Sequence, residues 1–263
     1  MKIFLLALTL AVAAHAKVLV VVTAHADDFS IFAGGTIAKL IDEGYTGYLI
    51  RVTDDEKDGV LTAPENSLRN GREVYDAARI IGLKEVFHLN IKNDEMDPLS
   101  GTELMEKLIL LIRKLKPDTV FTFDPWASYE ENPDHIKTAR AAVQASWMAQ
   151  IDRFHPEQIR AGLTVHYVNE LYLWARGPHV VNKVVDISST IDRKVEAMRA
   201  HGGMLREASI MTEMRDANRR IGALHKMPYA ELFHHVDSIG TGSGDKYKAL
   251  QVVPVEKRTE KKK

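Results

Sequence analysis

The sequence contains no cysteine, and this absence limits both how the protein is stabilised and which metals it can bind. Without thiols there can be no disulfide bonds, so stability must come from burial of the apolar side chains, which make up 45% of the 263 residues. A metal ion could be bound only by histidine and carboxylate side chains. Such ligands suit a catalytic site better than a structural one.

An excess of charge of either sign is also lacking, because 35 basic residues face 36 acidic ones and give a formal net charge of -1. No overall electrostatic field would draw the protein to nucleic acid or to an anionic membrane. We therefore expect a small-molecule partner and no nucleic acid, with the oligomeric state left open. The length allows one sizeable α/β core but not two independent enzymes, which favours a single domain.

Long hydrophobic runs are scarce, and one of them lies at the N-terminus, from Ile3 to Ala13. Met1-Lys2 precedes it and Ala14-His15-Ala16 follows it. A basic end, a short apolar stretch and a small-x-small site are typical of a secretory signal peptide, whereas a membrane-spanning helix needs about 20 apolar residues. We expect a signal peptide at 1–16, cleavage near Ala16, and a secreted or periplasmic protein without stable membrane insertion. A membrane anchor or a first strand is the alternative.

The rest of the chain divides into one domain at 17–250 and a charged tail at 251–263 that we expect to be flexible. The β-branched run from Lys17 to Thr23 is typical of a strand covered on both faces in a parallel sheet. Strand and helix patterns then alternate. The spacing predicts strands at 48–52, 85–89 and 119–123, and helices at 35–43, 68–81, 104–115 and 136–149.

This alternation predicts an α/β fold with a Rossmann-like, mostly parallel sheet and helices on both of its faces. The C-terminal part is less regular. Residues 165–174 and 183–187 predict strands that can pair antiparallel at an edge of the sheet, and helices are expected from about Ile191 onward.

Two polar clusters follow predicted strands, one at 24–28 and the other at 124–135. Ligands of open α/β sheets bind outside the carboxyl ends of the strands, so both clusters should face one crevice. His25 and Asp28 share a face if the chain makes a helical turn there. With His135 they form a three-ligand set with an open position, as expected of catalytic zinc, although iron(II) and other divalent metals use related sets. Taken alone, the first cluster also fits a helix start or a surface motif.

The residues in these clusters suggest a family. Ala24-His25-Ala26-Asp27-Asp28, followed by Gly34-Gly35-Thr36, resembles the AHPDD…GGT opening of the PIG-L/LmbE-like de-N-acetylases, and Asn132-Pro133-Asp134-His135 resembles their HPDH motif. Weaker similarities lie at 53–59, 73–82 and 228–233. The resemblance covers about residues 17–235.

The resemblance implies a Rossmann-like fold with one zinc ion on His25, Asp28 and His135, other divalent metals being open. It further implies that metal-bound water attacks the substrate, with Asp27 as general base. The substrate would be an N-acyl, typically N-acetyl, amide on an amino sugar or a related small molecule. The alternatives are a catalytically weakened sugar- or nucleotide-binding α/β module and a hydrolase of a non-sugar acyl amide.

One departure from the family concerns catalysis. Asn132 stands where the family usually has a histidine that assists at the developing oxyanion. Asparagine can donate a neutral hydrogen bond but supplies neither a proton nor a charge. We therefore take Asn132 and Tyr129, in the same loop, as candidate catalytic residues.

The remaining candidates would support the site. Asp124 and Asp134 are carboxylates that could orient an imidazole ring, although Asp134 could equally cap a helix. Arg69 lies one position away from a substrate-contacting arginine of the family, and His201 lies where a late family helix ends in histidine. Both are candidate substrate-binding residues, with an ordinary surface or core role as the alternative.

Overall fold

The computed structural model describes residues 16–94, 101–177, 179–202 and 209–237. The predicted signal peptide, apart from Ala16, and the tail at 251–263 lie outside these ranges, so export remains a prediction. Within the described residues, no helix combines the length and the apolar character needed to cross a membrane.

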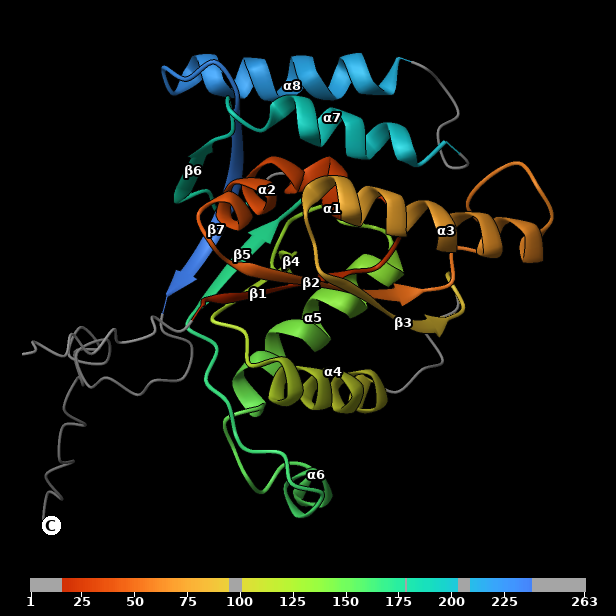
Figure 1. Ribbon diagram of the computed structural model, residues 1–263, viewed down its shortest axis with the longest axis vertical. Helices are drawn as coiled ribbons and strands as arrows, with labels where there is room; N and C mark the ends of the chain where they lie inside the picture. Colours follow the sequence, from red (N-terminus) through yellow and green to blue (C-terminus); the bar gives the residue numbers. More distant parts are fainter. Residues whose placement is uncertain (1–15, 95–100, 178, 203–208, 238–263) are drawn as a thin grey trace, which may run out of the picture.

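The centre of the fold is a seven-stranded sheet with the order β3-β2-β1-β4-β5-β7-β6 (Figure 1). The first five strands run parallel, and β7 pairs antiparallel with both β5 and β6. This confirms the predicted Rossmann-like sheet with antiparallel strands at its C-terminal edge. The strands are β1 (Val18–Thr23), β2 (Thr46–Thr53), β3 (Glu85–Ile91), β4 (Thr119–Phe123), β5 (Glu170–Trp174), β6 (Lys183–Asp186) and β7 (Ala230–Asp237).

Helices cover both faces of the sheet (Figure 1). α4 and α5 lie on one face, whereas α1, α2 and α3 lie on the other, with α7 packed over them and α8 outside α7. α6 lies beyond the α4–α5 side. Their bounds are α1 (Asp28–Phe32), α2 (Gly34–Asp42), α3 (Ala63–Ile81), α4 (Gly101–Leu115), α5 (Pro133–Met148), α6 (Pro156–Arg160), α7 (Ile191–Ala200) and α8 (Ile210–Leu224).

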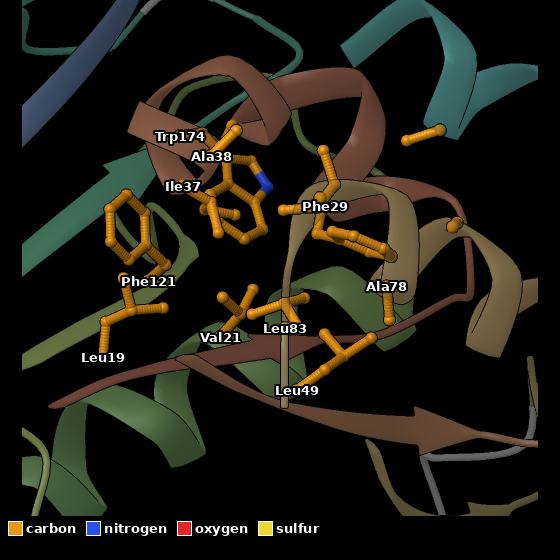
Figure 2. Packing of buried hydrophobic residues seen from close by; sticks show 14 of the residues in the cluster. Leu19, Val21, Phe29, Ile37, Ala38, Leu49, Ala78, Leu83, Phe121 and Trp174 are labelled. Atoms are coloured by element: carbon orange, nitrogen blue, oxygen red, sulfur yellow. The ribbon is translucent and has the colours of Figure 1, made fainter. Parts of the chain in front are cut away.

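Side chains of the central strand β1 alternate between two hydrophobic cores because successive residues of a strand point to opposite faces. Leu19 and Val21 pack with α2 and α3 on one face (Figure 2). Val20 and Val22 pack with α4 and α5 on the other. The sheet is therefore rigidly held, and the turns at its carboxyl edge start from fixed positions.

The short helices α1 and α6 were not predicted, and the start of α3 and the pairing at the C-terminal edge of the sheet also differ from the sequence-based expectation. α3 begins at Ala63 rather than Leu68, because Thr62 and Glu65 form a capping box around the start of the helix. The segments 165–174 and 183–187 contain strands β5 and β6, but these do not pair with each other; β7, which was not predicted, lies between them. The buried residues of β7 do not alternate regularly with exposed ones, which weakens its signal in the sequence.

A buried ion pair connects the C-terminal part of the chain to α2. Lys194 Nζ lies 2.6 Å from Glu231 Oε1, and both side chains are buried. The same carboxylate accepts hydrogen bonds from the backbone N–H groups of Gly35 and Thr36 at 3.0 and 2.8 Å. A Cβ atom on Gly35 would lie 2.8 Å from Ile187, so the close packing requires glycine there. These contacts hold α7 and β7 against the helix pair that follows the first polar cluster.

Candidate metal centre

The first polar cluster forms a tight turn between β1 and α1. The Oδ2 atom of Asp28 accepts hydrogen bonds from the backbone N–H of His25 at 2.7 Å and from the hydroxyl of Thr23 at 3.1 Å. These bonds close the turn and place the His25 ring and the Asp28 carboxylate on one side of it. Residues 24–27 form a bend and α1 begins only at Asp28, so the helical turn considered from the three-residue spacing is absent; the hydrogen bonds of the Asp28 side chain bring the two groups together instead.

The second cluster brings His135 to the same point, on the first turn of α5. Its Nε2 atom lies 3.1 Å from His25 Nδ1 and 3.3 Å from Asp28 Oδ1. Ligand atoms of all three residues lie within 4.8 Å of one another, and all three side chains are buried. The three ligands predicted from the sequence therefore lie together, because the segments that follow β1 and β4 meet at the carboxyl ends of these two strands.

Charge around these three residues fits a divalent cation. Asp27, Asp28 and Asp58 line one cavity of about 210 Å³ together with His25 and His135. Within the described residues, no lysine or arginine forms an ion pair with Asp27 or Asp28. Arg176 also lines this cavity, but its described ion pair is with Glu130. Asp27 and Asp28 thus face two imidazoles, a donor set that suits a metal with nitrogen and oxygen ligands.

A second group of possible ligands, formed by His25, Asp55 and Asp58, already includes an ion pair with Arg51. Asp55 and Asp58 also place ligand atoms within 4.8 Å of His25. Asp55, however, is ion-paired with the buried guanidinium of Arg51, at 3.1 Å between Oδ2 and Nη1. Burial raises the pKa of Asp55 to about 7, against the opposing effect of Arg51. The His25–Asp28–His135 set is therefore the better candidate for the metal.

The two adjacent aspartates have opposite electrostatics. Burial, reinforced by the neighbouring Asp28 carboxylate, raises the pKa of Asp27 to about 7. Burial also disfavours the charged form of Asp28, but its contacts with His135 and His25 outweigh it and hold the pKa of Asp28 well below its usual range. Asp28 is thus a permanent anion, whereas Asp27 can exchange a proton near neutral pH.

Each candidate histidine ligand has a carboxylate on its other side. Asp134 Oδ2 lies 3.2 Å from His25 Nε2, and Glu130 Oε1 lies 3.3 Å from His135 Nδ1. A carboxylate in this position fixes the tautomer and the orientation of the ring. Asp134 thus contacts the histidine that is distant in sequence rather than its neighbour His135.

The contacts of Asn132 and Asp124 add to this arrangement, and they exclude the helix cap that was the alternative for Asp134. The cap of α5 is Asn132, whose Oδ1 accepts from the backbone N–H groups of Asp134 and His135 at 2.8 and 3.2 Å, so Asp134 is not the cap. Asn132 also lines the cavity, and its side-chain N–H group is the donor that remains for a ligand. The Asp124 carboxylate contacts His234 Nδ1 at 3.0 Å and the backbone N–H of Trp126, rather than a candidate metal ligand.

Three other candidates lie away from the cavity. Tyr129 does not line it, and its side chain is 85% exposed. Arg69 forms an ion pair with Glu73 on α3, at 2.9 Å. His201 is fully buried behind α1, where Ser30 Oγ lies 3.1 Å from its Nε2 atom. A catalytic role for Tyr129 and substrate contact by Arg69 or His201 are therefore not supported by this geometry.

His201 should instead make the protein sensitive to acid. Burial lowers the pKa of His201 to about 4, below its usual value of about 6.5. The folded state thus disfavours protonation of His201. The free energy of unfolding therefore keeps its full value above about pH 6.5 and decreases as pH falls from there toward 4, because the unfolded chain binds the proton more readily. We expect His201→Asn to reduce the loss of stability between pH 7.5 and 5, measured by urea unfolding. His225→Asn, at an exposed histidine, is the control; an equal loss in wild type and His201→Asn would contradict the assignment.

Sequence reasoning missed three residues of the site: Asp58, Glu130 and Arg176. Glu130 stands one position after Tyr129 in a loop whose conformation no pattern predicts. Arg176 follows β5, and its Nη2 atom lies 3.3 Å from Glu130 Oε1 and 3.4 Å from His135 Nδ1. The placement of Arg176 after a parallel strand, at the carboxyl edge of the sheet, was the signal that could have identified it.

Comparison with known proteins shows consistent similarity to de-N-acetylases. The family model described as PIG-L, GlcNAc-PI de-N-acetylase, matches residues 20–146. A diacetylchitobiose deacetylase of Thermococcus kodakarensis is 32% identical over 67% of this chain and 66% of its own length. A 1D-myo-inositol 2-acetamido-2-deoxy-alpha-D-glucopyranoside deacetylase of Corynebacterium glutamicum is 30% identical over 71% and 74%, respectively.

Solved structures agree with these relatives. The N,N'-diacetylchitobiose deacetylase of Pyrococcus horikoshii superposes with a TM-score of 0.77 at 28% identity, covering 85% of both chains. The family model, at residues 20–146, includes both polar clusters together with β2, β3, β4 and most of β1. The chain therefore belongs to the PIG-L family of de-N-acetylases, which are amide hydrolases.

Proposed function

We propose that this protein is a metal-dependent hydrolase that removes an acetyl group from the nitrogen of an amino sugar. The observation that carries the proposal is the buried set of His25, Asp28 and His135, with mutual ligand-atom distances within 4.8 Å at the floor of a cavity that Asp27 also lines. The relatives named for deacetylation of amino-sugar derivatives support the substrate class. The alternative of a binding module without catalysis has no such support.

His25, Asp28 and His135 would hold the metal, with zinc as the expected ion. A divalent cation bound there would polarise an amide carbonyl oxygen and make a water molecule more acidic. The side chains Asp134 and Glu130 would keep the two imidazoles in the tautomers that leave His25 Nδ1 and His135 Nε2 free for the metal. The ligand set is thereby fixed before a substrate enters.

Asp27 would handle the proton. Its pKa of about 7 suits a group that accepts a proton from the attacking water and later donates it to the leaving amine nitrogen. Asn132 would donate a hydrogen bond from its side-chain nitrogen to the acetyl carbonyl oxygen, because capping of α5 already occupies its Oδ1 atom. The products are a free amine and acetate.

The proposal is tested by release of primary amine and acetate from N-acetylglucosamine and N,N'-diacetylchitobiose. Activity should disappear after treatment with a chelator and return when zinc or another divalent metal is added. Absence of amine release from both sugars with every divalent metal tried would overturn the proposed function.

Glu130 should matter for metal affinity although it does not face the metal. Glu130→Gln removes the charge that orients His135, so we expect metal affinity to fall by roughly 10- to 100-fold, the usual effect of losing such a partner. Competition with a coloured chelator measures the affinity. Glu131→Gln, at an exposed position in the same loop, is the matched control. Equal affinity in wild type and Glu130→Gln would show that Glu130 does not orient the ring.

A further inference from the structure

A second and larger cavity, of about 720 Å³, adjoins the cavity over the metal centre. The two share Ile31 and Phe32 of α1 and Arg176 after β5. A molecule whose amide lies above His25 and Asp28 can therefore extend from the smaller cavity into the larger one without leaving the protein surface.

One side of the larger cavity is apolar. Along α8 the residues that face it recur at helical spacing, and α1 contributes the opposite side. These side chains are Ile210, Met214, Ala217 and Ile221 from α8 with Ile31 and Phe32 from α1. An apolar hollow of this size that opens onto a reaction site favours an apolar group of the ligand, because its burial removes both surfaces from water.

The charged and polar groups of this cavity do not alter that conclusion. Glu231 is already neutralised by Lys194, and the side-chain nitrogen of Asn218 donates to the backbone oxygen of Ala230 at 2.8 Å. Glu213 and Arg220 are exposed, so they lie where the cavity meets solvent. None of the four requires a polar group in the interior of the cavity.

Trp174 and His179, which line the larger cavity, have polar atoms available to a ligand: the Trp174 Nε1–H is a donor, and His179 Nε2 is an acceptor because its Nδ1–H donates to the Gly177 carbonyl oxygen at 3.3 Å. Trp174 Nε1 and His179 Nε2 are buried atoms of the cavity wall with no hydrogen-bond partner among the described residues. Buried polar atoms of this kind are rare unless a ligand or water completes them. Arg176 adds a half-exposed cation at the junction. Polar atoms of a ligand thus have partners in Arg176 at the junction and in Trp174 and His179 on the wall of the larger cavity, and an apolar group has its place along α8.

We infer that the substrate is an amphiphile, whose polar amino-sugar part lies over the metal centre and whose apolar alkyl or aromatic group occupies the cavity between α1 and α8. The inference rests on the proposed function and specifies its substrate class. The apolar group has two chemical sources, since it is either the aglycone of the sugar or the acyl chain on the nitrogen.

Three substrates separate these cases: the methyl glycoside of N-acetylglucosamine, its octyl glycoside, and N-octanoylglucosamine, all below their micelle-forming concentrations. We expect kcat/KM for one octyl compound to exceed that for the methyl glycoside by at least about tenfold, which corresponds to burial of only two methylene groups. The preferred octyl compound identifies the source. Equal kcat/KM for all three would overturn the inference but not the proposed function, whereas no amine release from any of them would contradict the proposed function itself.

A cavity-filling variant tests the location. Ala217→Phe places a ring in the larger cavity and should abolish the preference for the octyl compound, measured as the ratio of its kcat/KM to that of the methyl glycoside in the same variant. Ala223→Phe makes the same substitution at an exposed position of α8 and should keep the preference. Retention of the full preference in Ala217→Phe would overturn the inference.

Discussion

Asp27→Asn should retain the metal and lose roughly 10²- to 10⁴-fold in turnover number, the usual range for a positioned general acid or base. The substitution keeps the shape of the side chain but removes the oxygen that can take a proton near neutral pH. Asp27 lines the cavity, yet no hydrogen bond or ion pair ties its carboxylate to His25 or His135 among the described contacts, so the ligand set should remain intact. Turnover at saturating substrate, together with metal content, measures the effect.

Asp76→Asn is a suitable control for this variant because Asp76 is exposed on α3, where its carboxylate pairs with Arg79. It should change neither metal content nor turnover. If Asp27→Asn emptied the metal site, Asp27 would be a ligand rather than the base. If it kept both the metal and full turnover, another group would have to move the proton.

Asp28→Asn should have the opposite pattern, with loss of the metal first and loss of activity as its consequence. The change replaces an anionic ligand with a neutral one and also weakens the bonds that close the turn at His25. We expect metal affinity to fall by more than about 100-fold, beyond the effect of losing a partner outside the ligand set. Activity should recover partly at high zinc concentration.

Metal titration of the Asp28→Asn protein distinguishes this outcome from a reversal of roles. A variant that keeps full metal occupancy at wild-type affinity but is inactive would make Asp28 the base. Circular dichroism of the variant separates loss of metal from loss of the fold, since the Asp28 carboxylate also closes the turn between β1 and α1.

Much of the fold could be predicted because buried parallel strands have a strong local signal. β1 and β4 are runs of almost wholly buried residues, while glycine and proline mark the ends of other helices, with Gly82 capping α3 and Pro117 following α4. β7 could not be predicted in the same way. Only some of its side chains are buried, and it contains His234 and His235, whose partners are known only once β5 and Asp124 are in place.

The residues of the site likewise divide into those that could be predicted from the sequence and those that could not. His25, Asp28 and His135 could be assembled from sequence because two local motifs follow parallel strands whose carboxyl ends must meet. The residues that orient them could not, because loop conformation decides which side chains turn inward. Glu130 and Tyr129 are adjacent, yet the first contacts His135 while the second is exposed to solvent.

His201 and Arg69 show why similarity of a sequence stretch does not by itself place a side chain in a site. His201 follows the last residue of α7, as the pattern indicated. Because α7 packs over α1, the imidazole is buried and contacts Ser30. Arg69 lies on α3, where Glu73 one turn later holds its guanidinium. The register of a helix against its neighbours, rather than the residue type, decides which side chains reach the cavity.

The most direct test of the account is the metal content of the protein purified without chelator, measured by elemental analysis alongside its deacetylase activity. One metal site built from His25, Asp28 and His135 predicts about one equivalent of a divalent metal, with zinc expected, and activity proportional to occupancy. A protein that contains no divalent metal and gains no activity from any that is added would contradict the central claim.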